Sequence, residues 1–268
     1  MKQLAAALCL LPLLTGGCSL NRMAASQTGS MIHEGLSAYY EEQDLKTAQD
    51  SLLSNLKLME VLLKNDPAST ELKTSLAQGY CAYAFMFSED KEPERAKYFY
   101  HKGAAFTSDM GAASVKRNKK NLPAMFWNSF CRAGYIQLDL QNPDSIAELP
   151  ALEQQTDELL KADPEYFYNG AHALKGSLAA SRPVMLGGKP ELAKQHFEAA
   201  LSGKGAYFQL NRFLYAKTYA VQVQDPDLFA RLLEQAISDV QALPEQRLIN
   251  EAVKARAHSL LEKKNELF

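Results

Sequence analysis

The chain has neither an apolar run long enough to cross a lipid bilayer nor an excess of charge of one sign. The apolar segment Leu4–Leu14 is shorter than the roughly 20 residues that a membrane-spanning helix needs. Lys and Arg together number 29, against 31 for Asp and Glu, so the sequence carries no basic footprint for nucleic-acid phosphates. We therefore predict that this segment does not span a membrane and that nucleic acid is not a partner.

Motifs that carry catalysis or bind metals are also lacking. The chain contains no His-Glu-x-x-His, no Gly-x-Ser-x-Gly, no Walker lysine loop and no Cys-x-x-Cys pair. Residues 88–91 match Ser-x-x-Lys by letter, but they fall in a polar turn where neither group would lose its water. No two of the five histidines are three or four residues apart, the spacing that places two ligands on one helix face. Nothing in the sequence predicts an enzyme, a metal site or a cofactor.

The N-terminus, by contrast, carries a strong signal. Lys2 precedes the apolar segment, and small residues then lead to Cys18, an order that resembles a bacterial lipoprotein signal. The resemblance implies that residues 1–17 are removed as a signal peptide and that Cys18 is lipidated, which anchors the chain to a membrane. By resemblance to the sorting rule of Gram-negative bacteria, Ser19 after the cysteine favours the outer membrane. The alternative is an ordinary cleaved signal with an incidental Cys18.

Two further predictions concern the mature chain. Residues 19–30 are small, polar and without apolar periodicity, which predicts a lipidated N-terminus and flexible tether over residues 18–34. With Cys9 removed and Cys18 lipidated, only Cys81 and Cys131 remain in an oxidising compartment. They could form one disulfide, or each could be a small core residue.

Residues 35–268 read as one helix after another, with no alternation of period two long enough for a strand. Asp44 is placed to cap a helix whose apolar residues recur every three or four positions up to Leu63. Further helices are expected at 67–87, 93–106, 127–140, 144–162, 164–181, 190–201, 207–223, 227–242 and 244–264. The fold class predicted is all-α.

Asp-Pro pairs between helices, and the spacing of alanine and aromatic residues within them, indicate a repeat. Ala96 and Tyr100, and likewise Ala193 and Phe197, match the small-residue and aromatic spacing of the second helix in tetratricopeptide repeats. Asp-Pro pairs close one helix and open the next at residues 66–67, 163–164 and 225–226. We therefore predict a tetratricopeptide-like helical domain, an α-solenoid of helical hairpins, over residues 35–268.

Three segments resemble the T component of TRAP transporters. They are Phe126–Phe130, Asp163–His172 and Ser181–Leu201, the last containing Arg-Pro-Val-Met-Leu-Gly-Gly-Lys-Pro-Glu-Leu-Ala-Lys. The resemblance runs from about Leu52 to Leu233. It implies a lipid-anchored, periplasm-facing protein that can assemble as a homotrimer, with a pore or cleft through each subunit. It also implies association with the periplasmic substrate-binding component of a TRAP system, which imports organic acids or other small ligands.

Large and polar side chains in three successive first helices suggest where such a cleft would lie. The residues predicted to line it are Tyr80, Tyr83, Trp127, Arg132, Tyr135, His172 and Arg182. Two guanidinium groups could pair with a carboxylate, so an organic acid would suit the cleft. We place Arg182 near His172 or Trp127 at its mouth. The alternatives are that the aromatic rings are core and that Met185 and Leu186 plug the end of the array.

Two functions from different classes follow from these observations. The first is a non-enzymatic accessory component of a TRAP-type transport system, which binds the substrate-binding component and holds a small organic ligand. The second is a general envelope scaffold that uses the same helices to hold partners in cell-envelope assembly. A channel lined by polar side chains among aromatics favours the first, and an open concave groove favours the second.

Overall fold

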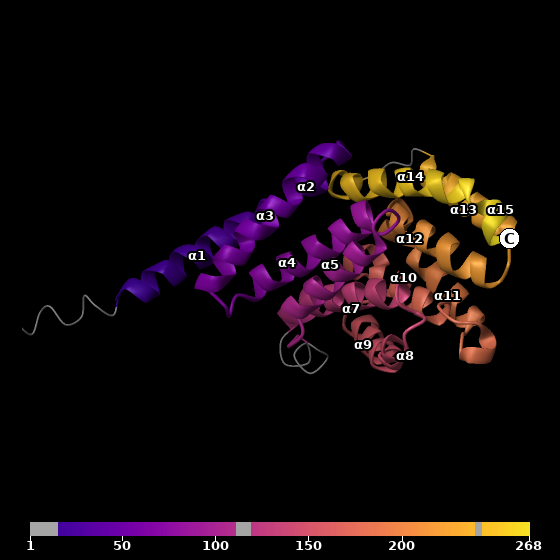
Figure 1. The fold of residues 1–268 in the computed structure, drawn as a ribbon, viewed down its shortest axis with the longest axis horizontal. Helices are drawn as coiled ribbons and strands as arrows, with labels where there is room; N and C mark the ends of the chain where they lie inside the picture. The colour runs from indigo at the N-terminus through magenta and orange to yellow at the C-terminus, as the bar shows by residue number, and fades with distance from the viewer. Residues whose placement is uncertain (1–15, 111–118, 239–242) are drawn as a thin grey trace, which may run out of the picture.

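A computed structural model describes residues 16–110, 119–238 and 243–268, and the regular structure in these ranges is entirely helical (Figure 1). The α-helices are α1 (Gly16–Glu34), α2 (Ser37–Tyr40), α3 (Leu45–Asn65), α4 (Thr70–Tyr83), α5 (Pro93–Phe106), α7 (Leu122–Gln137), α8 (Pro143–Ala147), α9 (Leu149–Ala162), α10 (Tyr166–Ala179), α11 (Pro190–Ala200), α12 (Gln209–Leu214), α13 (Pro226–Ile237), α14 (Arg247–Glu262) and α15 (Lys264–Leu267). Two π-helical segments, η2 (Ala84–Ser88) and η6 (Tyr215–Ala220), continue α4 and α12. Within the described ranges, no helix combines the length and apolarity needed to span a membrane.

Local signals account for the helix starts. The side chain of Asp44 accepts a hydrogen bond from the Thr47 amide at 2.7 Å, and Asp225 caps α13 in the same way through Leu228 at 2.8 Å. Each cap satisfies an amide that the first helical turn leaves without a partner. Proline occupies the first turn of α5, α11 and α13, where its missing N–H costs nothing. The predicted all-α class is confirmed.

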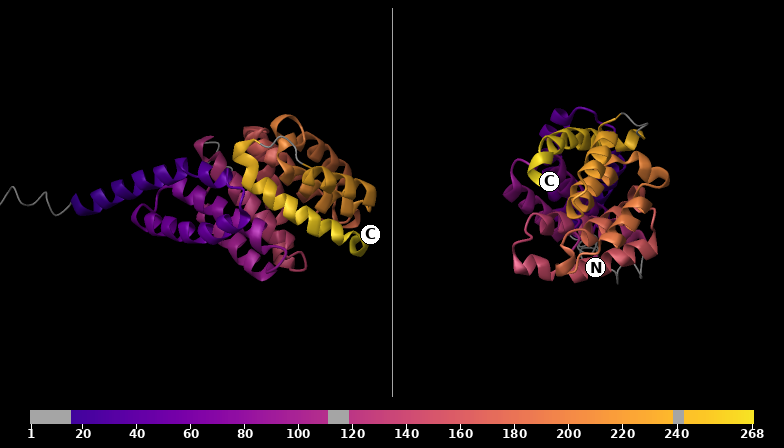
Figure 2. Two further views of the ribbon diagram at one scale, coloured as in Figure 1. Left: turned by 90° about the horizontal axis from the view of Figure 1, so that it is seen from above. Right: turned by 90° about the vertical axis from the view of Figure 1, so that its right-hand side faces the viewer.

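Most of the long helices pack against the next long helix along the chain, and α14 returns to the beginning. The pairs α3 and α4, α5 and α7, α10 and α11, and α13 and α14 are in contact. Helix α14 also contacts α2, α3 and η2, and Figures 1 and 2 show one of its ends reaching these N-terminal segments while the rest of it runs beside the C-terminal helices. This return brings helices from the two ends of the described chain into contact.

Cys81 of α4 and Cys131 of α7 form a disulfide, with their Cα atoms 5.4 Å apart. Of the two hypotheses for these cysteines, the disulfide is the one that the structure contains. Helix α5 crosses beside it at Gly103, where a Cβ atom would lie 2.3 Å from the Cys81 sulfur. Only glycine allows α5 this close to the bridge.

The prediction of a flexible tether at residues 18–34 is wrong for the backbone, which forms α1. Ala25 and Gly29 are buried, and a Cβ at position 29 would touch Leu72 of α4 at 3.0 Å. These small residues let α1 pack closely, and the imidazole Nδ1 of His33 lies 2.9 Å from the Ser75 hydroxyl. A composition of small polar residues therefore reflects close helix contact here. Residues 1–15 of the predicted signal peptide and the side chain of Cys18 lie outside what the structure describes.

Other boundaries differ from the predicted ones for local reasons. The helix expected over 144–162 is divided into α8 and α9, because Pro150 has no N–H to continue a helix from Ile146. The expected helices 67–87 and 207–223 each end in a π-helical segment, which shifts the side chains that follow around the axis. The last residues of the helix expected at 227–242 fall outside the described ranges, and α13 ends at Ile237.

Candidate ligand cavity

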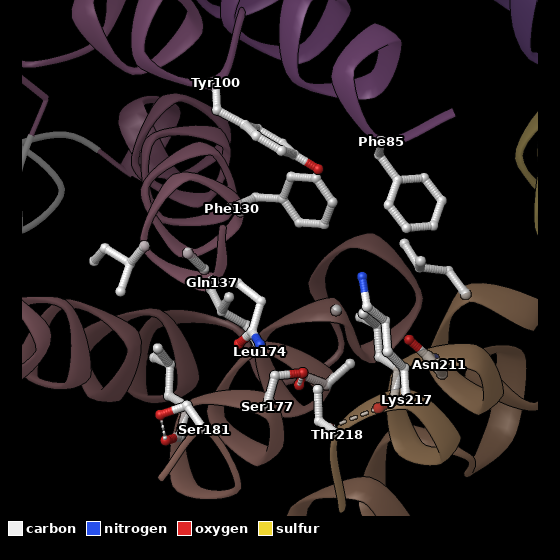
Figure 3. Close-up of a pocket in the computed structure, with 18 of the residues that line it drawn as sticks. Phe85, Tyr100, Phe130, Gln137, Leu174, Ser177, Ser181, Asn211, Lys217 and Thr218 are labelled. Atoms are coloured by element: carbon white, nitrogen blue, oxygen red, sulfur yellow. Dashed lines mark hydrogen bonds between the residues drawn. The ribbon is translucent and has the colours of Figure 1, made fainter. Parts of the chain in front are cut away.

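Two neighbouring cavities occupy the interior. The first, here called the lysine cavity, is lined by η2, α5, α7, α10, α12 and η6, and encloses about 840 Å³ of empty space including its mouth. Its polar side chains include Glu89 and four residues that Figure 3 labels, Gln137, Asn211, Lys217 and Thr218. The second, the tyrosine cavity, has about 1250 Å³ of empty space when its open mouth is included. It is named for four phenols that line it, Tyr39, Tyr40, Tyr166 and Tyr168.

The two cavities share an apolar wall made of Phe85, Phe130, Phe167, Phe208 and Leu210. Phe167 lies at its centre, with ring centroids 4.9 Å from Trp127, 5.3 Å from Phe126 and 5.4 Å from Phe208. Such edge-on contacts fix ring positions more tightly than apolar burial alone. The two cavities thus lie on either side of the same five apolar residues.

An unusual backbone turn holds Phe167 in this wall. Phe167, Tyr168 and Asn169 all have positive φ, at 48°, 58° and 63°, a left-handed turn that costs roughly 1–2 kcal/mol per residue. The Asn169 amide stabilises the turn by donating to the carbonyls of Ser202 at 2.8 Å and Ala199 at 3.1 Å. Strain of this kind is concentrated at functional positions, and here it directs an aromatic ring between two cavities.

A buried charge network closes one end of the lysine cavity. The carboxylate of Glu89, at the end of η2, pairs with Lys217 of η6 and accepts a hydrogen bond from the Tyr100 hydroxyl at 2.9 Å. Arg256 of α14 lies 3.4 Å from the same carboxylate. Arg256 also makes a bidentate pair with Asp90 at 2.6 and 2.7 Å. Two acids and two bases make the network neutral and join segments more than 160 residues apart.

The positive charges in this network stabilise the ionised form of Glu89. Burial alone raises the pKa of Glu89, but the attraction of Lys217 and Arg256 outweighs burial and lowers this pKa to about 2. The guanidinium of Arg256 also lies over the rings of Phe85 and Phe213, 4.1 and 4.9 Å from their centroids. Arg256 thereby connects the network to the apolar wall.

The residues predicted to line a cleft are dispersed. Trp127 lines the tyrosine cavity. Tyr80 and Tyr83 are core residues that pack on Phe99, and the Tyr80 hydroxyl donates to Glu60. Tyr135 lies beside the ring of His101 and outside both sets of lining residues. For Tyr80 and Tyr83, the core alternative is the correct one.

The polar members of the predicted cleft lie away from both cavities. Arg132 pairs with Glu148 at 2.9 Å and Arg182 with Glu153 at 2.6 Å, and neither lines a cavity. His172 Nδ1 lies 2.9 Å from His196 Nδ1, and burial lowers the pKa of both imidazoles. The expected pair of guanidinium groups for one carboxylate is therefore absent from the described cavities, since each arginine is held by its own glutamate.

Met185 and Leu186 do not plug the end of the array. Together with Val184 they form the short turn η4 (Val184–Leu186), and Met185 is 96% exposed. The turn is held at its base by Gly188, whose amide donates to Pro183 O at 3.0 Å. Three apolar side chains are thus presented to solvent next to Arg182.

Comparison with protein-family models gives a match to the TRAP transporter T-component over residues 41–268. The match covers every element that lines the lysine cavity. The chain belongs to the TRAP transporter T-component family. A comparison with curated proteins finds no match.

Some cavity residues of this T-component lie in segments that the sequence marks only as helical or as similar to the family. Phe130 and Phe167 lie in two of the segments that resemble the family, and Phe85 lies in the helix expected at 67–87, but nothing local marks them as sharing one wall. Asn211 and Lys217 lie in a helix predicted only from its apolar pattern. Their role depends on η6 and on Glu89, which lies 128 residues earlier in the chain.

The positions of the two arginines lead to a prediction. Arg132→Ala and Arg182→Ala should each leave ligand affinity in the cavities of this T-component unchanged, because their ion pairs lie outside both. Isothermal titration with any ligand that binds the parent chain measures this. Leu174→Trp, which fills part of the lysine cavity, is the matched control that should reduce binding there. A loss of affinity in either arginine variant at unchanged melting temperature would contradict the cavity assignment.

Proposed function

We propose that the chain is a non-enzymatic, lipid-anchored accessory component of a TRAP-type transport system. In this role it associates with the periplasmic substrate-binding component and holds a small organic ligand in its interior. Cys18 carries the lipid, and the outer membrane is the site of anchoring. The observation that carries the proposal is a pair of apolar cavities inside a member of this family, because ligand sites are mostly apolar hollows with a few polar groups.

We infer a tetratricopeptide-like array, which the helix pairs of this protein support, and a homotrimer, which the resemblance to the family implies. Ala96 and Tyr100 on α5, and Ala193 and Phe197 on α11, are all buried. In each pair the alanine allows close helix approach and the ring fills the gap beside it. An array of this kind, closed by α14, explains how the chain encloses its cavities.

The exposed turn Val184–Leu186 is the surface that we assign to the substrate-binding component. Val184, Met185 and Leu186 are 65%, 96% and 69% exposed, which is unusual for three consecutive apolar residues. Exposed apolar groups of this kind mark contact sites. Pro183 and Gly187, which has φ of 92°, fix the path of the turn and present it in one conformation.

The test is purification of the natively processed protein from envelope extracts. We expect an intact mass that begins at residue 18 with added acyl groups, a trimer by light scattering, and co-purification of the substrate-binding component. Met185→Ser should reduce that co-purification without changing the melting temperature, and Met31→Ser, on exposed α1, is the matched control. Recovery of cell-wall or envelope assembly proteins in place of a TRAP component would favour the scaffold function.

A further inference from the structure

The lysine cavity contains a buried acceptor whose orientation is unambiguous. The Asn211 side-chain nitrogen lies 2.9 Å from Tyr168 O, 2.9 Å from Ala200 O and 3.2 Å from Gly205 O. An amide oxygen in that position would face three carbonyl oxygens, so the nitrogen must occupy it and the oxygen must point the other way. The three carbonyls thus determine where the Asn211 oxygen lies.

That oxygen has no hydrogen-bond partner among the described residues. Asn211 is only 1% exposed and lines the lysine cavity, and Figure 3 shows it beside Lys217 on the cavity wall. A buried acceptor without a donor is unfavourable and rare in native proteins. Its position therefore indicates that a donor arrives from inside the cavity.

The neighbouring hydroxyl groups cannot supply that donor. The Thr218 hydroxyl donates to Leu214 O at 2.6 Å, the Ser177 hydroxyl to Ala173 O at 2.9 Å, and the Ser181 hydroxyl to Leu178 O at 2.8 Å. Each of these protons is used within its own helix, which leaves oxygen lone pairs facing the cavity. These three hydroxyl groups thus present acceptors among apolar side chains, while Gln137 and Lys217 carry the N–H donors of the lining.

The charges of the cavity disfavour an anionic ligand. Glu89 and Asp90 already balance Lys217 and Arg256, so an added carboxylate would bring an unbalanced charge into an apolar space. It would also place its lone pairs against those of Asn211. A neutral donor has neither disadvantage.

We propose that the lysine cavity binds a neutral, apolar molecule that carries a hydroxyl group, and that this hydroxyl donates its proton to the Asn211 amide oxygen. The inference rests on the proposed function, in which the chain holds a small organic ligand, and it names the chemical class of that ligand. The ammonium group of Lys217, which points into the cavity (Figure 3), is placed to donate to the same hydroxyl oxygen.

The experiment varies the probe rather than Asn211, because this amide also holds three carbonyls and its removal would destabilise the fold. Decanol, nonyl methyl ether and decanoate are titrated into the mature protein by calorimetry. Decanol and the ether have the same number of heavy atoms, but only decanol carries a proton to donate. We expect decanol to bind about tenfold more tightly than the ether, and decanoate to bind more weakly than decanol.

Two variants show which cavity is responsible for the preference for decanol over the ether. Leu174→Trp narrows the lysine cavity and should abolish the difference between decanol and the ether. Ala82→Trp narrows the tyrosine cavity and should leave the difference intact, and melting temperatures confirm that both variants fold. Equal affinities for decanol and the ether, as when a water satisfies Asn211, or tightest binding of decanoate, would overturn the inference and leave the proposed function standing. Failure of all three probes to bind would overturn ligand holding as well, whereas co-purification with a TRAP component tests partner binding separately.

Discussion

Replacing Arg256 by Met should lower the free energy of unfolding at pH 7 by about 3–5 kcal/mol. The side chain is 6% exposed and joins Asp90, Glu89 and the carbonyl of Phe85, the last at 2.7 Å. Methionine keeps most of the volume but leaves that carbonyl without its donor and the Glu89 charge poorly balanced. Chemical denaturation followed by circular dichroism measures the loss.

The same denaturation experiment at low pH tests the electrostatic part of the stability that Arg256 contributes. The pKa of Glu89 is about 2 in the folded protein and about 4.3 in an unfolded chain. This lowered pKa contributes stability above pH 4.3, and the contribution is lost as the pH falls toward 2. Because Arg256 helps to lower the pKa, the difference between parent and variant should narrow over that range. A difference that stays constant with pH would assign the effect of Arg256 to packing alone.

Arg95 provides the control for this substitution. Its side chain is 46% exposed and pairs with Glu92 at 3.1 Å on the surface of α5. Exposed pairs of this kind contribute less than about 1 kcal/mol, so Arg95→Met should change stability little at any pH. Equal losses in the two variants would indicate that the buried network has no special role.

Removal of the disulfide by Cys81→Ala and Cys131→Ala together should destabilise the protein by about 4 kcal/mol. The bridge joins residues 50 apart in sequence, and the loss of loop closure in the unfolded chain accounts for a value of this size. For a chain of this length, the melting temperature should fall by roughly 10 °C. Differential scanning calorimetry of both proteins measures the change.

A reducing agent gives an independent check of the bridge. It should lower the melting temperature of the parent chain and leave that of the double alanine variant unchanged. Mass spectrometry after alkylation shows whether the two thiols have been released. Released thiols with no change in melting temperature would mean that packing around Gly103 holds α4, α5 and α7 together without the bridge.

Local interactions explain why much of the fold was predictable. Asp44 caps α3 and Pro93 opens α5 through contacts within one helical turn, so a few neighbouring residues decide both boundaries. The alanine and aromatic pairs of α5 and α11 were visible as spacings for the same reason. The predicted removal of Cys9 and lipidation of Cys18 leave one possible disulfide pair. Only the packing of α4 against α7 around Gly103 shows that the two sulfur atoms of this pair meet.

The candidate site was mostly not predictable, because its parts are distant in sequence. Arg132 and Arg182 appeared suited to bind a carboxylate until the structure placed Glu148 and Glu153 beside them. Small residues within positions 18–34 predict a tether by composition alone, whereas in the structure Ala25 and Gly29 allow close packing of α1.

The sequence by itself determined the helical class, the family and the starts of α3, α5, α11 and α13, since each depends on short-range patterns. The tertiary structure alone decided the cavities. The left-handed turn at Phe167 is stabilised by carbonyls about 30 residues further along the chain. The π-helical segments place Glu89 and Lys217 together, and α14 brings Arg256 to them. The free energy that stabilises the turn and the charge network comes from contacts between residues that are distant in sequence. No local sequence pattern encodes such contacts.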